Sequence, residues 1–230
     1  MSVVSVASLR ARLPSRWVLT ALVWGAALTV GWTVVGGRGL DTRVLRDGLF
    51  FLAGPMLFVA VWRRSPAELG WRVDRRALRN TAALALFVLP FYLVGSSLPS
   101  IRTYYPMWGT TADPAAFLPY AAKQLVVVVA AETYYRGLLC VGVREIGVGS
   151  ALISPVVYAV HHLSKPPVEL LLSGPTDVLF GVVDYDARSV LPSVVAHGLG
   201  LTLLDWLVLH DPLLPPGRVV RWLRWLPVGL

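Results

Sequence analysis

The chain has 230 residues, enough for one ordinary domain; 56% of them are hydrophobic, only 15% are charged, and the mean hydropathy is +0.64. This composition excludes a soluble globular domain and predicts an all-α, polytopic membrane protein, a helical bundle of about seven (six to eight) transmembrane helices. The formal net charge of +8 comes almost wholly from arginines that cluster between apolar runs, which membrane topology explains better than nucleic-acid binding does.

Seven apolar runs, each bounded by charged residues or by proline and glycine, are the predicted membrane spans in chain order: 17–36, 47–62, 80–97, 116–143, 150–164, 168–183 and 189–209. Several are shorter than the ~20 residues of a full crossing, as happens when helices are tilted or shielded by neighbours. The spans divide the chain into a basic N-terminal segment (1–16), N-terminal transmembrane helices and loops (17–115), a core (116–210) and an amphipathic C-terminal tail (211–230).

The arginines also predict an orientation. Six of them lie between residues 63 and 79, so the positive-inside rule places this loop and the N-terminus in the cytoplasm and the aromatic loop 98–115 outside. Seven crossings would then put the tail outside as well. The three tail arginines are interleaved with Trp222 and Trp225, which is typical of a cytoplasmic interfacial helix. Either one short run is re-entrant or the tail lies on the outer surface.

The fourth run contains a carboxylate and a guanidinium, Glu132 and Arg136. Ionised groups at bilayer depth cost roughly 2.5 to 3.5 kcal/mol each on insertion scales, and they mark functional sites by default. At spacing i, i+4 the two side chains share one helical face, with the acid N-terminal to the base, which is the better order for pairing. One interpretation is a salt bridge that fixes helix packing; the other makes Glu132 a general base or acid tuned by Arg136.

The fifth run ends in two histidines, His161 and His162, shortly before Lys165. Adjacent residues on a helix point about 100° apart, so we expect only one of the two rings to face a common site. His162 lies four residues after Tyr158 and is the better candidate, since an aromatic ring backs it. A single histidine on an apolar helix is more often a hydrogen-bonded core residue than a functional one.

The last run carries His197 and Asp205. Glycines at 198 and 200 allow another helix or a substrate backbone to come close to His197. Asp205 follows eight residues later, about 12 Å along the axis and about 80° round from His197. We therefore expect Asp205 to orient a partner or to cap the end of the span.

One glutamate and two histidines also satisfy a zinc-ligand count, with Glu132, His162 and His197 as the set. These residues come from three different runs and match no zinc-protease spacing, and the single cysteine, Cys140, excludes a cysteine-rich site. We expect no metal and no other cofactor, with hydrolysis by a carboxylate-activated water. The zinc alternative stays open.

The polar residues of the core, taken in order, resemble the three motifs of one family: Glu132-x-x-x-Arg136-Gly137, then Tyr158-x-x-x-His162 with Lys165, then His197 with Asp205. The family is that of the CPBP intramembrane endopeptidases, the CAAX prenyl protease and bacteriocin-processing enzymes, also called Abi. The resemblance covers roughly residues 116–210. It implies an all-helical fold, a polar site that opens within the bilayer, and cleavage of peptide bonds in or near the membrane.

The resemblance also implies roles. Glu132 would activate water, Arg136 would position and tune it, and His162 and His197 would stabilise the oxyanion; Tyr158, Asp205, Lys165 and His161 would support them. Ala131 stands where the family motif has its first glutamate, so Glu132 would serve alone. Leu201 stands four residues after His197, where many members carry a polar residue.

The sequence therefore predicts an intramembrane endopeptidase, a multi-pass protein of a bacterial inner membrane whose partners are the lipid bilayer and a membrane-embedded or lipidated peptide. A prenylated C-terminus, a leader peptide and a sorting-signal tail are all compatible substrates, and no nucleic acid is expected. Two alternatives remain: a non-catalytic, immunity-like membrane scaffold, in which the polar residues only hold helices together, and a small proton-coupled transporter.

Overall fold

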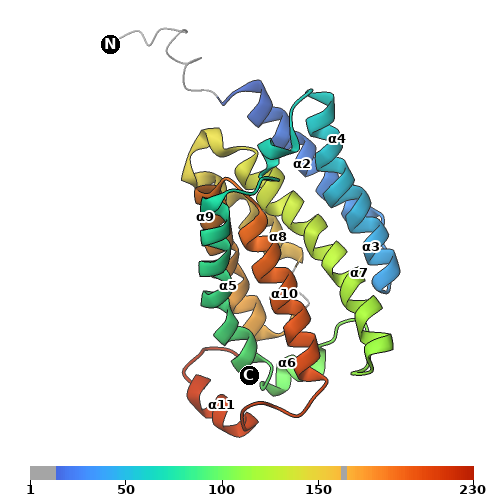
Figure 1. Cartoon of the computed structure of the whole chain (residues 1–230), viewed down its shortest axis with the longest axis vertical. Coiled ribbons are helices and arrows are strands. Elements are labelled where there is room, and N and C mark those ends of the chain that lie inside the picture. Colours follow the sequence, from blue (N-terminus) through green and yellow to red (C-terminus); the bar gives the residue numbers. More distant parts are fainter. Residues whose placement is uncertain (1–13, 162–164) are drawn as a thin grey trace.

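Helices make up most of the described chain (Figure 1). The computed structural model describes residues 14–161 and 165–230, with only the backbone for residues 159–161. No strand occurs in these ranges, so the predicted all-α fold class is confirmed. Most of the predicted basic N-terminal segment and the predicted site residue His162 lie outside the described residues.

Within residues 14–161 and 165–230, five helices are long and apolar enough to cross a membrane. They are α2 (Arg16–Val34), a rod at Leu40–Val61 formed by α3 (Leu40–Asp47), the π-helix η1 (Gly48–Ala53) and α4 (Gly54–Val61), then α5 (Arg75–Gly95), α7 (Pro114–Glu132) with its continuation η3 (Thr133–Val141), and α10 (Leu191–Val208). The chain is accordingly a multi-pass membrane protein.

The other two predicted spans differ from expectation. Within the described residues the fifth consists of the 3₁₀-helix η5 (Val148–Leu152) and α8 (Ile153–His161), and its predicted last residues, 162–164, lie outside them. The sixth, α9 (Pro167–Ala187), has 21 residues but carries four carboxylates, at positions 169, 177, 184 and 186, which make it too polar to qualify. The predicted count of seven is therefore not confirmed for the described residues.

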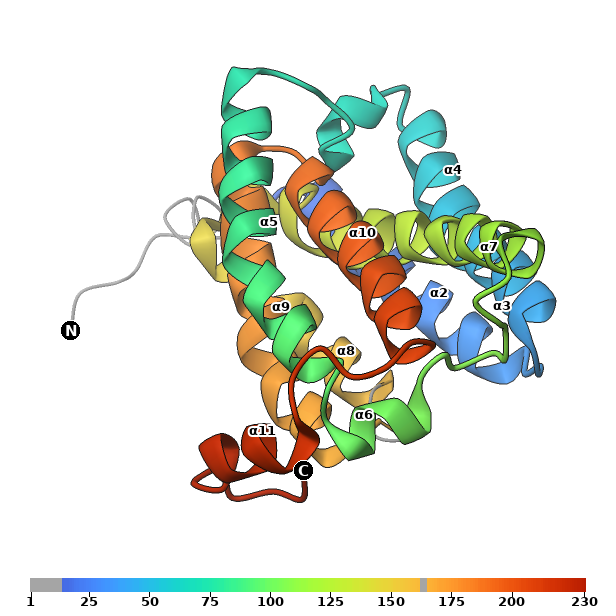
Figure 2. The ribbon, with the colours of Figure 1, turned by 60° about the horizontal axis from the view of Figure 1, so that its bottom comes forward.

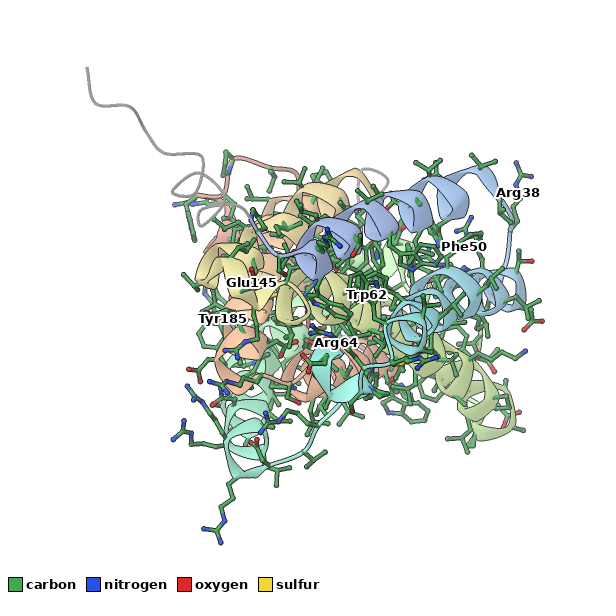
Figure 3. All side chains as sticks on the ribbon, turned by 90° about the horizontal axis from the view of Figure 1, so that it is seen from above. Arg38, Phe50, Trp62, Arg64, Glu145 and Tyr185 are labelled. Atoms are coloured by element: carbon green, nitrogen blue, oxygen red, sulfur yellow. The ribbon has the colours of Figure 1, made fainter. Side chains whose placement is uncertain are left out.

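The arginine-rich loop lies at one end of the bundle. We call this end the arginine end, and it comprises residues 14–17, 62–76, 142–150 and 184–191. The indole of Trp17 donates a 2.6 Å hydrogen bond to the carbonyl of Gly142, and the amide of Val190 donates to the carbonyl of Gly70 at 3.0 Å. The short helices η2 (Pro66–Leu69) and η4 (Arg144–Ile146) lie here. Figure 3 looks onto this end and labels Trp62, Arg64, Glu145 and Tyr185.

The opposite end holds α6 (Pro99–Tyr104) and the C-terminal α11 (Pro216–Leu223), which lie close together in Figure 2. Val219 of α11 is fully buried in a cluster with Leu98 and Ile101, and the amide of Leu214 donates to the hydroxyl of Ser97. The tail therefore lies at the end opposite the arginine loop, which is the arrangement expected if it lies on the outer surface.

Close packing of α5 against α10 brings the site helices together. Gly200 makes this approach possible, because a Cβ at this position would collide with the ring of Tyr92 on α5. Gly48 offers a contrast, since its helical backbone has open space where a Cβ would stand.

We predict that Gly200→Ala lowers the free energy of unfolding by about 1–3 kcal/mol, because the added methyl overpacks the α5–α10 contact. Gly48→Ala is the matched control and should be neutral or slightly stabilising, because alanine has the better helix propensity. Thermal unfolding of the purified variants in detergent measures both. Equal melting temperatures for the two variants would contradict the packing assigned to Gly200.

Candidate active site

The helix that carries the polar motif changes its winding at the motif itself. Residues 116–143 are predicted as one membrane span, and within this span α7 is followed at Thr133 by the nine-residue π-helix η3, in which every residue is buried. Its last turn closes with a 2.7 Å bond from the amide of Gly142 to the carbonyl of Gly137, five residues back. A Cβ on Gly137 would come within 3.0 Å of the carbonyl of Leu69, so this face packs on the chain at η2. π-helical turns occur frequently at functional sites.

The guanidinium of Arg136 lies between two carboxylates, and all three side chains are fully buried or nearly so. Its Nε is 3.4 Å from Glu132 Oε2, so the predicted i, i+4 pair is present. Its Nη1 is 2.5 Å from Asp177 Oδ1 on α9. Neither contact is aligned as a hydrogen bond, and both act through charge. The rings of Tyr158 and Phe180 lie 5.4 and 5.7 Å from the guanidinium carbon.

His197 reaches the same cluster from α10. Its Nδ1 lies 2.6 Å from Glu132 Oε1, a contact that joins residues 65 positions apart. Glu132 is fully buried, whereas 23% of the His197 side chain is exposed. Through Nδ1 the carboxylate thereby fixes the orientation of the imidazole. The other ring nitrogen, Nε2, does not contact the carboxylate. Two carboxylates against one guanidinium leave an excess negative charge, and a hydrogen bond donated by His197 Nδ1 offsets part of it.

A cavity of about 350 Å³ opens beside this cluster. Its polar wall is formed by Arg136, Asp177 and His197, and Ala131 contributes a methyl group. Glu132 is not among the described residues that line it, since it lies behind His197 and Arg136. Phe87 and Phe91 of α5 line the opening and are 57% and 55% exposed, so the cavity communicates with the lipid-facing side of the bundle.

A second polar group lies farther along the same cavity. Lys165 Nζ contacts the hydroxyl of Tyr105 at 2.6 Å and Glu169 Oε1 at 2.8 Å, and the Tyr105 hydroxyl donates to Glu169 at 2.9 Å. The predicted supporting residue Lys165 therefore faces the cavity, but its contacts are with α9 and the loop after α6 rather than with Glu132.

Asp205 joins this outer level from α10. It accepts hydrogen bonds from the hydroxyl of Tyr120 and from Nε2 of Gln124, both at 2.6 Å, and so fastens α10 to α7. Among the described residues the hydrogen-bond partners of Asp205 are Tyr120 and Gln124 rather than a site histidine, and its orienting role stays a prediction. Gln124 lines the cavity eight residues, about 12 Å, before Glu132.

The remaining predicted site residues, Tyr158, His161 and His162, belong to the fifth predicted span. Tyr158 lines the cavity and packs edge-on against Tyr135. His161 ends α8, and only its backbone is described; His162 lies outside the described residues. Among the described residues no three histidine, cysteine, aspartate or glutamate side chains are grouped to hold a metal ion. The zinc set required His162, so the absence of a cofactor stays a prediction.

Asp177 and its partner Ser154 were not predicted. The hydroxyl of Ser154 on α8 donates a 2.8 Å hydrogen bond to Asp177 Oδ2, which fixes the carboxylate from the side away from Arg136. Asp177 lies 41 residues after Arg136, and no local spacing connects the two. A signal was nonetheless present, because an aspartate inside the apolar run 168–183 is an intramembrane ionisable residue.

Part of the chain matches a known protein family. Residues 113–201 match the family model described as Rce1-like, type II CAAX prenyl endopeptidase. The match confirms the resemblance to the CAAX protease family, and it spans Glu132, Arg136, Asp177 and His197 but ends before Asp205. No curated protein and no solved structure matches the chain significantly.

We predict that Arg136→Met destabilises the protein by about 3–5 kcal/mol, because it leaves Glu132 and Asp177 buried without a counter-ion. The double variant Glu132→Gln with Arg136→Met should lose less than the sum of the single losses, because it removes charges of both signs. Thermal unfolding in detergent supplies the double-mutant cycle. Additive losses would show that the two charges are not coupled.

Proposed function

We propose that the protein is an intramembrane endopeptidase of the CAAX protease type, which hydrolyses a peptide bond in a membrane-associated substrate. The observation that carries the proposal is the contact of Glu132 with His197, made next to Arg136 at a cavity with an apolar opening. The family match adds independent support at the level of protease activity.

Water activation is assigned to Glu132 and His197 acting as a pair. The sequence-based hypothesis gave this role to Glu132 alone, but the Oε1 of Glu132 is engaged by His197 Nδ1 and the carboxylate stands behind the ring. A neutral imidazole held in this way takes a proton from water on Nε2, while the carboxylate stabilises the imidazolium that forms. The water oxygen then bonds to the peptide carbonyl carbon.

The second half of the reaction uses the cation. The carbonyl oxygen becomes negatively charged as the tetrahedral intermediate forms, and Arg136 is the cation beside Asp177 and His197 on the cavity wall. A fixed donor aimed at a developing oxyanion is worth ~2.7–4 kcal/mol of barrier. The imidazolium then returns its proton to the amine nitrogen as the carbon–nitrogen bond breaks. His162 stays a predicted second contributor to oxyanion binding.

The opening of the cavity supports a lipid-borne substrate. Phe87 and Phe91 expose about half of their surface where the cavity meets the outer face of α5. A hydrocarbon chain can enter along such an apolar surface without first crossing water. We therefore favour a peptide with a prenylated C-terminal cysteine box, the substrate class in the description of the matched family.

The proposed location is a bacterial inner membrane with the arginine end in the cytoplasm. Arg16 at the start of α2 and the arginines of the loop 63–79 lie at this end, together with Arg144. The positive-inside rule then gives a cytoplasmic N-terminus and a tail on the other side.

We predict that Glu132→Gln lowers the turnover number by about 100-fold or more while the protein still inserts, because glutamine keeps the shape but not the charge that stabilises imidazolium. The assay is cleavage of an internally quenched peptide with a farnesylated Cys-aliphatic-aliphatic-Ser terminus by the purified protein in detergent. Glu68→Gln, at an exposed residue of η2, is the matched control. Undiminished cleavage by the Glu132 variant would defeat the mechanism.

We also predict that Phe91→Ala raises KM for the farnesylated peptide roughly tenfold, since it removes apolar contact at the opening worth ~1.4 kcal/mol. KM for the same peptide without the prenyl group should not change. Leu86→Ala, on α5 but outside the cavity lining, is the control for the general effect of truncating an exposed side chain. An equal change of KM with both peptides would show that the prenyl chain does not bind at Phe91.

A further inference from the structure

Two contacts of Asp177, together with its position at the cavity, go beyond helix packing. Asp177 is 1% exposed yet lines the cavity. Its Oδ1 makes the shortest contact of Arg136, at 2.5 Å, against 3.4 Å for the contact of Arg136 with Glu132. Its Oδ2 is fixed by the hydroxyl of Ser154. One carboxylate thus connects α8, α9 and the π-helix η3 at the wall of the cavity.

The arrangement has a consequence for Glu132. Arginine prefers a bidentate contact with a single carboxylate, and Glu132 four residues before it is the nearest candidate in sequence. That bidentate contact does not form. The guanidinium lies closer to Asp177, and Oε1 of Glu132 contacts His197 instead. Without Asp177, the buried cation would keep Glu132 as its ion-pair partner among the described residues and would compete with His197 for it.

We propose that Asp177 is a positioning residue of the site: from α9 it holds the guanidinium of Arg136 at the cavity wall, where Arg136 binds the oxyanion, and it leaves Glu132 to His197. This assignment rests on the proposed function. It predicts that Asp177 acts on turnover rather than on substrate binding, because the oxyanion forms only in the transition state.

The matched control is Asp47 on α3. It is also a fully buried carboxylate that contacts an arginine, with Oδ2 at 2.7 Å from Arg43 Nε, and it also accepts a second hydrogen bond, from the indole of Trp32. Asp47 does not line the cavity. Asp177→Asn and Asp47→Asn therefore each neutralise a fully buried carboxylate paired with an arginine, and the two arginines differ in that the side chain of Arg43 is 31% exposed and that of Arg136 is 2% exposed.

The kinetic experiment uses the farnesylated quenched peptide. We expect Asp177→Asn to lower kcat about 100-fold at nearly constant KM, the size of effect that misplacement of a catalytic group by about 1 Å produces. Asp47→Asn should keep kcat within about threefold. Ser154→Ala, a milder change that removes only the hydroxyl donor, should lower kcat by a smaller factor. Wild-type kcat in both the Asp177 and Ser154 variants would overturn the proposal, as would an equal loss in the Asp47 variant.

A second readout does not depend on proteolysis. Phenylglyoxal, an apolar reagent for arginine, is applied to the full-length protein in detergent, and modified peptides are quantified by mass spectrometry. Asp177→Asn should raise modification of Arg136 several-fold and leave Arg43 unchanged, and Asp47→Asn should do the reverse. An unchanged reactivity of Arg136 in the Asp177 variant would overturn the proposal. If the wild-type protein fails to cleave the peptide, the proposed function fails. The phenylglyoxal reactivities of Arg136 and Arg43 in the two variants still decide whether Asp177 positions Arg136.

Discussion

The buried guanidinium of Arg136 is the constraint around which the core of this protein is organised. A charge removed from water needs opposite charges at short range, because a medium of low dielectric constant strengthens each attraction but also makes an unpaired charge costly. Glu132 supplies one partner from the same helix and Asp177 supplies the other from α9. The relative placement of η3 and α9 follows from this requirement as much as from apolar packing.

His197 extends the cluster to a third helix. A second layer of polar residues lies on the same three helices, farther along the cavity. Glu132, Asp177 and His197 each have a polar residue eight positions away on their own helix, namely Gln124, Glu169 and Asp205, and eight residues of helix rise about 12 Å. The outer residues contact one another or Lys165, Tyr105 and Tyr120. The cavity therefore has polar groups at two depths with apolar wall between them, which ties α7, α9 and α10 together at both levels.

The sequence was informative where chemistry and spacing coincide. The i, i+4 spacing of Glu132 and Arg136 predicted their pairing, and the Rce1-like match over residues 113–201 confirms the resemblance drawn from the motifs. Nothing in the spacing could bring His197 to Glu132, since this contact depends on how α10 packs, and the sequence only proposed it through the family. Asp177 was not predicted, because apolar residues dominate the run 168–183 in which it lies. The hydrophobic pattern of the sequence carries no signal for the π-helix η3. Hydropathy alone also does not decide whether the predicted spans 150–164 and 168–183 cross the membrane.

The order of these residues along the chain matters during synthesis at the ribosome. Arg136 emerges only four residues after Glu132, so α7 enters the membrane with one counter-ion already on its own face. Asp177 follows about forty residues later, a delay of roughly 2 to 8 s at ~5–20 residues per second. During that interval the nascent helix carries its guanidinium with a single partner, and the translocation machinery or a water-filled path must accommodate it until α9 arrives.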